Sequence, residues 1–149
     1  MDHERWMRQA LALADEAAAA GEVPVGCVIV REGRIVGRGR NRREEDRSAL
    51  AHAEMDAIRE ACAALGDWRL TDCGLYVTLE PCPMCAGAIL NARLKWLCFG
   101  ARDPKTGSCG SVLNLFEENY GYRPAIYGGI LEAECLERLQ AFFRGLRNG

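Results

Sequence analysis

Two cysteines three positions apart, Cys82 and Cys85, are the residues whose spacing most directly indicates chemistry. They follow the apolar residues 75–79, which predict a buried strand, and Pro83 suits the first position of a helix continuing to Asn91. The positive end of a helix dipole lowers the pKa of nearby thiols, so this helix start favours thiolates that can bind a metal. A redox pair and half of a structural zinc site are the alternatives for this motif.

A third metal ligand is predicted at His52, one of two histidines in the chain. The other, His3, lies close to the N-terminus, and no second pair of cysteines has the spacing needed to complete a four-thiolate site. Three protein ligands leave a fourth position for water, which is typical of catalytic zinc. Glu54 follows two residues after His52 and is placed to transfer protons. Taken alone, His52 and Glu54 would be better explained as a helix-capping histidine and a solvated glutamate, and it is the cysteine motif that favours the metal site.

The histidine and cysteine motifs together match a known pattern. His52-Ala53-Glu54 followed by Pro81-Cys82-Pro83-Met84-Cys85 has the form of the zinc deaminase signature. Wider segments resemble the bacterial tRNA-specific adenosine deaminases, in the same order and over nearly the whole chain: residues 22–26, 39–42, 51–54, 78–82 and 99–107. The sequence departs from this family at residues 119–123, where its members usually carry an Asn-His pair. One rim of the substrate site is therefore expected to differ.

The resemblance implies a fold and a cofactor. The fold class is α/β, a cytidine-deaminase-like three-layer α/β/α fold with a five-stranded mixed sheet and helices on both faces. Residues 1–149 are expected to form a single zinc-dependent nucleoside deaminase domain, which assembles as a homodimer. One Zn²⁺ per chain would be held by His52, Cys82 and Cys85, with Glu54 as the catalytic residue.

The implied reaction is the hydrolytic deamination of a base. A zinc-activated water would attack C6 of adenine, and Glu54 would carry protons to the ring and to the leaving amine. The resemblance places Asn41 and the backbone at Ala53 on the flipped base, and Asp103 and Phe143 beside the RNA. Asn41 and Asp103 have turn formation as the alternative, since one follows a predicted strand and the other precedes a proline.

The charge pattern bears on whether the substrate is a nucleic acid. A formal net charge of −2 is unusual for a nucleic-acid binder. However, all but two of the nineteen basic residues are arginine, which suits bidentate contacts to phosphate. Seven of them lie close together: Arg31, Arg34, Arg38, Arg40, Arg42, Arg43 and Arg47. We expect Arg42 to contact the RNA, although a charged hairpin edge that resists aggregation would have the same composition.

Composition and length indicate an ordinary globular domain. The 149 residues are 49% hydrophobic and 27% charged, enough to bury a core without disulfides. No apolar run approaches the roughly 18 residues of a membrane span, so we expect no membrane association and a cytoplasmic location. Among the cysteines outside the motif, Cys27, Cys62, Cys98 and Cys135 are expected to be small buried hydrophobes, whereas Cys73 and Cys109 are free thiols of unassigned environment.

The order of elements follows from hydrophobic periodicity and from capping residues. Asp2 is expected to cap a first helix that ends near Gly21. Helices are then expected at residues 52–65, 82–91, 112–118 and 131–146, and strands at 25–30, 34–38, 75–79, 95–99 and 125–127. Glu32 and Gly33 are expected to form a tight turn. The helices that carry the metal ligands should lie on one face of the sheet, with their N-termini meeting at the metal.

The function expected from these features is the conversion of the wobble adenosine of a tRNA anticodon stem-loop to inosine, with an arginine tRNA implied by the resemblance. The alternatives are a deaminase of a free base or nucleoside such as guanine or cytosine, and a non-catalytic zinc module that binds RNA. Leu90, Leu94 and Trp96 are candidates for the dimer contact, or else belong to the core. Of the adjacent Phe142 and Phe143, we expect one in the core and the other toward the dimer or the RNA.

Overall fold

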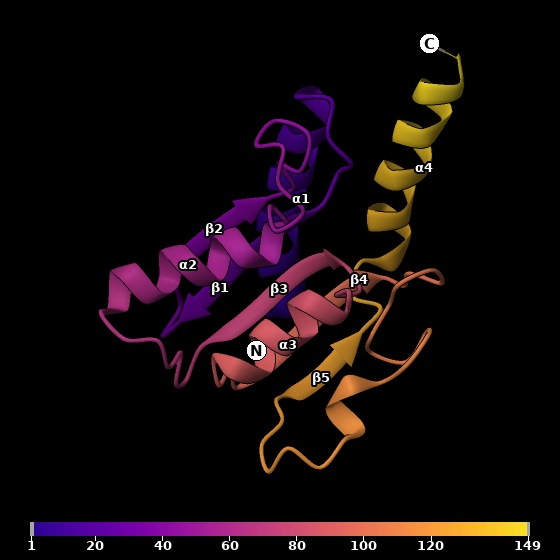
Figure 1. Cartoon of the computed structure of the whole chain (residues 1–149). Helices are drawn as coiled ribbons and strands as arrows, with labels where there is room; N and C mark the ends of the chain where they lie inside the picture. Colours follow the sequence, from indigo (N-terminus) through magenta and orange to yellow (C-terminus); the bar gives the residue numbers. More distant parts are fainter. Residues whose placement is uncertain (1, 149) are drawn as a thin grey trace.

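A five-stranded mixed sheet is the centre of the structure, a computed structural model that describes the backbone of residues 2–148 and the side chains of residues 2–146 (Figure 1). The strand order is β2-β1-β3-β4-β5. β1 runs antiparallel to both β2 and β3, whereas β3, β4 and β5 are parallel to one another. The bounds are β1 Gly26–Arg31, β2 Arg34–Arg40, β3 Gly74–Leu79, β4 Trp96–Ala101 and β5 Ala125–Gly128.

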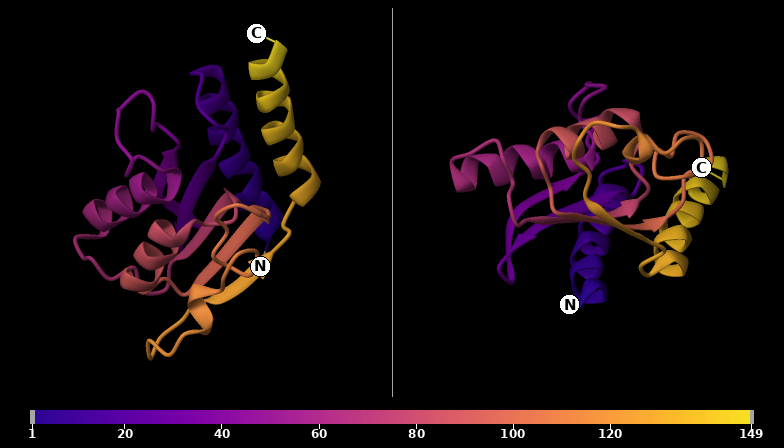
Figure 2. Two further views of the ribbon diagram at one scale, coloured as in Figure 1. Left: turned by 45° about the vertical axis from the view of Figure 1, so that its right-hand side comes forward. Right: turned by 90° about the horizontal axis from the view of Figure 1, so that it is seen from below.

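Four α-helices cover the two faces of this sheet. They are α1 His3–Ala19, α2 Ala53–Leu65, α3 Pro83–Asn91 and α4 Glu132–Asn148. α2 and α3 pack on one face, and α1 and α4 pack on the other, as Figure 2 shows in the view from below. The predicted three-layer α/β/α architecture is therefore confirmed, including the placement of both ligand-bearing helices on one face.

The central strands are buried on both sides, which explains their nearly continuous apolar sequence. In β1, Cys27 and Ile29 pack toward α2 and α3, while Val28 and Val30 pack toward α1. Tyr76 of β3 lies in the second of these clusters. Successive side chains of a strand point to opposite faces, so one strand contributes to two separate hydrophobic cores.

Local signals in the sequence predicted the turns and caps. Asp2 accepts a hydrogen bond from the backbone N–H of Arg5 and so caps α1. Glu32 and Gly33 both have positive φ, as a two-residue hairpin turn between twisted strands requires. Gly66 ends α2 in the left-handed conformation, with its N–H bonded to the carbonyl of Cys62.

The helix predicted at residues 112–118 is wrong in extent, because only a short 3₁₀ turn, η1 Leu115–Glu117, forms there. The N–H of Val112 bonds to the carbonyl of Gly107, which holds the chain in a turn where a helix would have begun. The side chain of Asn114 then caps the single turn by accepting from the N–H of Phe116. The buried ring of Phe116 fixes this turn against the core.

The cysteine predictions are largely confirmed. All eight cysteines are free thiols. Cys27, Cys98 and Cys135 are buried as expected, but Cys62 is only half-buried because it lies near the exposed end of α2. The two cysteines without an assigned environment, Cys73 and Cys109, are both buried.

Two of the three residues suggested for a dimer contact belong to the core of the protomer. Leu94 is fully buried and Leu90 nearly so, and both lie in the core under α3. Trp96 is half-buried, and its indole N–H donates to the Tyr76 hydroxyl at 3.0 Å. Leu90 and Leu94 are therefore core residues, the alternative considered for them, whereas a dimer contact at Trp96 stays a prediction. No helix in the described part of the chain is both long and apolar enough to cross a bilayer.

Candidate active site

Close packing of α2 on β2 sets the position of the first candidate ligand. Gly37 and Gly39 of β2 lie directly beneath α2, and a Cβ at Gly39 would be 2.1 Å from the carbonyl oxygen of Ala53. Only glycine allows this approach, and the small Ala57 on the facing side of the helix is buried against the strands. His52 is the N-cap of α2, so this contact fixes the backbone that carries the imidazole and the carboxylate of Glu54.

The second pair of candidate ligands lies at the start of α3. β3 ends at Leu79, Cys82 is the N-cap of α3, and Pro83 occupies the first turn as predicted. Cys85 follows in that first turn and is buried. α2 and α3 are in contact, so their N-termini bring these three side chains together.

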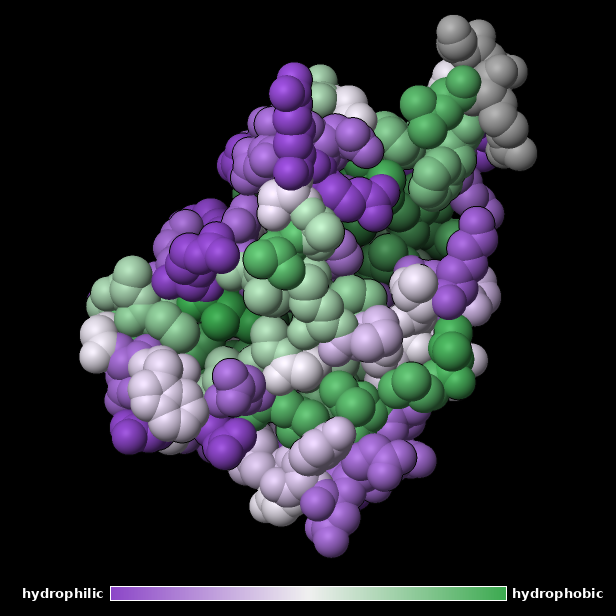
Figure 3. All heavy atoms as spheres, in the orientation of Figure 1, coloured by the Kyte–Doolittle hydropathy of each residue, from purple (hydrophilic) through white to green (hydrophobic). Residues whose placement is uncertain are grey.

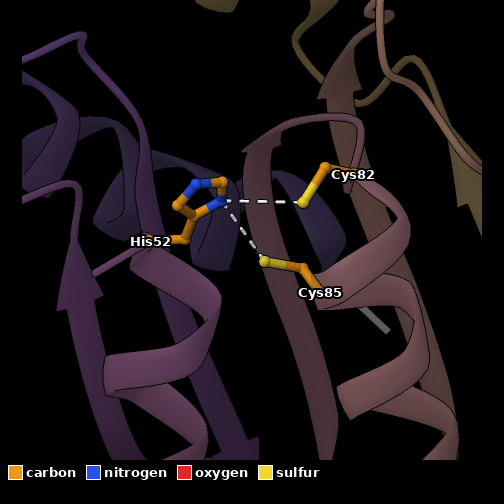
Figure 4. Close-up of side chains that lie close together, drawn as sticks. All are labelled: His52, Cys82 and Cys85. Carbon is orange, nitrogen blue, oxygen red and sulfur yellow. Dashed lines mark hydrogen bonds between the residues drawn. The ribbon is translucent and has the colours of Figure 1, made fainter. Parts of the chain in front are cut away.

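Figure 4 shows His52, Cys82 and Cys85 converging from the two helix ends. Nδ1 of His52 lies 3.6 Å from Sγ of Cys82 and 3.5 Å from Sγ of Cys85. A tetrahedral Zn²⁺ with Zn–N of about 2.0–2.1 Å and Zn–S of about 2.3 Å would hold such atoms about 3.5–3.6 Å apart. All three ligand atoms lie within 4.8 Å of one another. The donor set therefore fits Zn²⁺.

The pKa values of these groups show why the cluster favours a cation. A hydrogen bond from Cys85, together with His52, lowers the pKa of Cys82 to about 4. The same hydrogen bond and burial raise the pKa of Cys85. The hydrogen bond to Cys82 raises the pKa of His52. These shifts favour a thiolate at Cys82 and protons on its two neighbours, and a metal ion replaces such protons when it binds.

Glu54 lies beside this cluster and is only 4% exposed. Burial raises its pKa to about 7, and the nearby Cys82 acts in the same direction, while a hydrogen bond from its own backbone N–H opposes the shift. A carboxyl group with a pKa near neutrality can both accept and donate a proton at physiological pH. Cys27 of β1 is fully buried nearby, and burial together with the charge of Glu54 raises the pKa of its thiol.

A cavity of about 420 Å³ opens over these residues. Its size is within the range usual for small-molecule sites. Figure 3 shows hydrophobic residues along α4 facing a hollow, with the hydrophilic loop between β2 and α2 on the opposite side. The lining residues are Val23, Val25, Asn41, Arg43, His52, Ala53, Glu54, Leu79, Glu80, Cys82, Arg102, Asp103, Pro104, Lys105, Thr106, Leu136, Leu139, Gln140 and Phe143.

The sequence and fold of this chain match those of known proteins. The sequence profile of the MafB19-like deaminases matches residues 1–147. The chain belongs to that deaminase family. A tRNA-specific adenosine deaminase of Bacillus subtilis is 50% identical over 145 residues, covering 97% of this chain and 90% of the relative.

Solved structures of relatives also match this deaminase. One from studies of tRNA:A34 deaminases that edit A to I at the wobble position has a TM-score of 0.87 and 45% identity, covering 91% of this chain and 99% of its own. A guanine deaminase from Bacillus subtilis has a TM-score of 0.67 and 36% identity, covering 97% and 95%. The protein is therefore an enzyme with the expected cytidine-deaminase-like fold.

The deaminase places four of the five predicted substrate residues at the cavity. Ala53 lines it as the first residue of α2. Asn41 also lines it, and its side chain is held by the backbone: Oδ1 accepts from Arg43 N, and Nδ2 donates to Val23 O. Asp103 lines the opposite side and accepts from the backbone N–H of Lys105. Asn41 and Asp103 thus have the turn-forming role considered from the sequence and also face the cavity.

The two adjacent phenylalanines of α4 differ in exposure, but neither belongs to the hydrophobic clusters, so the core position expected for one of them is not found. Phe143 is 45% exposed and lines the cavity, whereas Phe142 is half-buried. Their rings meet edge to face with centroids 5.5 Å apart. α4 therefore contributes an aromatic side chain to the cavity wall.

The arginine-rich segment does not act as one patch. Arg42 is absent from the cavity lining and lies 3.6 Å from Glu45 and 3.5 Å from Asp56. Its neighbour Arg43 is exposed and lines the cavity. Arg31 and Arg34 lie opposite each other at the hairpin turn, about 20 Å along the strand from the nearest cavity-lining residue, Val25, at about 3.4 Å per residue.

Sequence reasoning missed several lining residues and misplaced one rim. Residues 119–123 do not line the described cavity, because Tyr122 packs on the turn after α3 and donates hydrogen bonds to the carbonyls of Arg93 and Leu94. The polar Glu80 at the end of an otherwise apolar strand was a signal that could have been recognised. The contribution of Leu136 and Gln140 depends on how α4 lies against the body and had no local signal.

Proposed function

We propose that this deaminase converts the adenosine at the first anticodon position of a tRNA to inosine. The observation that carries the proposal is its 50% identity, over 97% of the chain, to a tRNA-specific adenosine deaminase. The cavity supports it, since cationic side chains of Arg43, Arg102 and Lys105 line its walls. The whole chain would act as one catalytic domain in the cytoplasm.

His52, Cys82 and Cys85 would hold the metal in this proposal. A zinc ion bound there would supply a water of lowered pKa as the nucleophile. The convergence of one imidazole and two sulfurs at 3.5–3.6 Å supports one Zn²⁺ per chain. Burial of Cys85 excludes bulk water from that side of the cluster.

Glu54 would move the protons of the reaction. Its carboxylate accepts a proton from the attacking water and delivers it to N1 of adenine as the oxygen bonds to C6. The carboxylate then removes the remaining proton from the new C6 hydroxyl and gives it to the amine, so that a C6 carbonyl forms as the C6–N bond breaks and ammonia leaves. Both directions of transfer suit a group whose pKa is about 7.

The base would be held by groups at the mouth of the cluster. Ala53 is the first residue of α2, where backbone N–H groups lack partners within the helix. Asn41 is 9% exposed with a fixed side chain and would read the edge of the base. Asp103 and Phe143 would contact neighbouring nucleotides, for which an exposed aromatic ring offers a stacking surface.

A free-base deaminase is the second candidate, because a guanine deaminase is among the structural relatives. The test is ammonia release from an anticodon stem-loop, adenosine, guanine and cytosine, with sequencing of the RNA for inosine. We expect conversion of the stem-loop adenosine and no turnover of guanine. Turnover of guanine with an untouched stem-loop would replace the tRNA proposal by this second one. Comparison of all tRNAs in a total pool then tests the expected preference for an arginine tRNA.

The two neighbouring arginines offer a matched test of the RNA contact. Arg43→Gln is expected to raise KM for the stem-loop and to reduce the salt dependence of log Kd by about 0.7, the value for one phosphate of a single strand. Arg42→Gln should change KM and the salt dependence of binding less, because Arg42 is paired with Glu45 and Asp56. Zinc content should be unchanged in both variants. Equal effects would show that position relative to the cavity does not decide the contact.

We also propose a homodimer, on the basis of the resemblance stated above. The exposed hydrophobic side chains that could contribute to a contact include Val112, Leu113 and Tyr120. Light scattering at micromolar concentration should give twice the mass of the 16.4 kDa chain. The mass of a single chain would contradict the dimer without affecting the proposed reaction.

A further inference from the structure

Two buried carboxylates outside the ligand cluster require an explanation. Glu22 and Glu80 are each only 2% exposed. An ionised carboxylate is rarely buried unless hydrogen bonds compensate the loss of water. The partners of both residues are hydrogen-bond donors on loops that border the cavity.

Glu80 binds the loop after β4. Its Oε1 accepts from the backbone N–H of Asp103 at 3.0 Å, and its Oε2 accepts from the N–H groups of Cys109 at 2.9 Å and Ser111 at 3.1 Å. The hydroxyl of Ser111 donates to Oε1 as well. One carboxylate therefore holds both ends of the segment whose residues 102–106 line one wall of the cavity.

The loop fits this carboxylate closely. A Cβ added to Gly107 would lie 2.4 Å from Cδ of Glu80, so only glycine permits the approach. The N–H of Ser108 also donates to the carbonyl of Pro81, which precedes the candidate ligand Cys82. The wall is thus attached to the same turn that carries the cluster.

Glu22 has the corresponding role on the other side. Its two carboxylate oxygens accept from the backbone N–H groups of Glu44 at 3.1 Å and Glu45 at 2.7 Å. These residues belong to the loop between β2 and α2, which contributes Asn41 and Arg43 to the cavity.

We propose that Glu22 and Glu80 are positioning residues, each of which fixes one wall of the cavity so that the walls meet the substrate in a defined arrangement. This inference rests on the proposed function for the identity of the substrate. Every partner given above is a donor, so each site needs a group that only accepts. An ionised carboxylate accepts at both oxygens, whereas a glutamine of the same shape would turn an N–H₂ group toward other N–H groups. Hydrogen bonds to an ionised acceptor are also the stronger kind.

Two isosteric variants test the inference. Hydrogen exchange of backbone amides should be faster at Asp103, Cys109 and Ser111 in Glu80→Gln, with no change at Glu44 and Glu45. Glu22→Gln should show the reverse pattern. Loss of a hydrogen bond to a charged group corresponds to about tenfold or more in such an equilibrium.

Steady-state kinetics provide a second measurement, which a loss of stability alone would not change. Each variant should raise KM about tenfold or more for the substrate that the wild-type enzyme deaminates. The value of kcat per zinc-loaded site should be nearly unchanged, as expected when binding is lost equally in the ground and transition states. Glu60→Gln, an exposed carboxylate on α2, is the control and should match the wild type in both measurements. Ser111→Ala removes one donor from Glu80 and is the milder variant should Glu80→Gln fold poorly.

The outcomes separate this inference from the proposed function. Faster exchange confined to the partner loop, with raised KM, supports the positioning role whichever base is deaminated. Exchange that is unchanged at both loops, or that rises equally throughout the sheet with KM unaltered, would overturn it. A stem-loop that the enzyme does not deaminate would count against the tRNA proposal. Hydrogen exchange would still decide the positioning role of the two carboxylates.

Discussion

Glu54→Ala is expected to abolish deamination while zinc content, fold and RNA binding persist. Removal of a general acid–base group typically costs 10²–10⁴-fold in rate, about 3–5 kcal/mol of transition-state stabilisation. Here the carboxylate would serve two proton transfers in succession, so the upper part of that range is expected. The residue lies beside the cluster without belonging to the three side chains that fit the metal, so the metal should remain.

The measurement combines single-turnover rates with metal analysis and circular dichroism. Glu54→Gln keeps the shape of the side chain and should be as inactive as the alanine variant, because an amide cannot exchange the protons. Glu60→Ala changes an exposed carboxylate on the same helix and should retain full activity. If Glu54→Ala kept more than about a tenth of the wild-type rate, another group would have to move the protons.

Much of the fold could be predicted because its signals are local. Pro83 and Gly66 mark one helix start and one helix end, and Glu32-Gly33 marks the hairpin turn. The ligand set was also accessible, since the spacing of Cys82 and Cys85 depends on a single helix turn. His52 could be predicted as the third ligand because three protein ligands leave one coordination position open for water, as in a catalytic zinc site.

The remaining parts depend on contacts between distant segments. The donors to Glu80 lie 23 to 31 residues away along the chain and are mostly backbone N–H groups, which no residue type reveals. Leu90 and Leu94 are apolar whether they face a partner chain or the core, and only the packing of α3 on the sheet decides between these environments.

The different environments of Arg42 and Arg43 also depend on contacts between distant segments of the chain. Both are arginines in a charged loop, and the sequence offered no reason to choose the second. In the folded chain α2 brings Asp56 to 3.5 Å from Arg42, while the adjacent residue faces the cavity. The number of arginines in this segment therefore overstates the positive surface available to phosphate.

Cys85→Ser is expected to lower zinc content and stability together. The hydroxyl of serine is a poor ligand for zinc, and the folded cluster loses one of its three donors. A metal that binds only the folded state adds RT ln(1 + [L]/Kd), about 2.7 kcal/mol at a hundredfold excess over Kd. For a domain of this size that corresponds to a fall in Tm of about 5–10 °C.

Zinc per chain and thermal unfolding would be measured on the same preparations. Cys62→Ser is the matched control, because Cys62 is half-buried and donates to the carbonyl of Trp68, a bond that a hydroxyl can also make. It should keep one zinc per chain and a nearly unchanged Tm. Wild-type protein treated with a chelator should unfold at a temperature near that of Cys85→Ser, because both lack the same stabilising ion. Full zinc occupancy in Cys85→Ser would show that Cys85 is not a ligand of the metal. The three-residue cluster around Cys82 would then not be the expected zinc site.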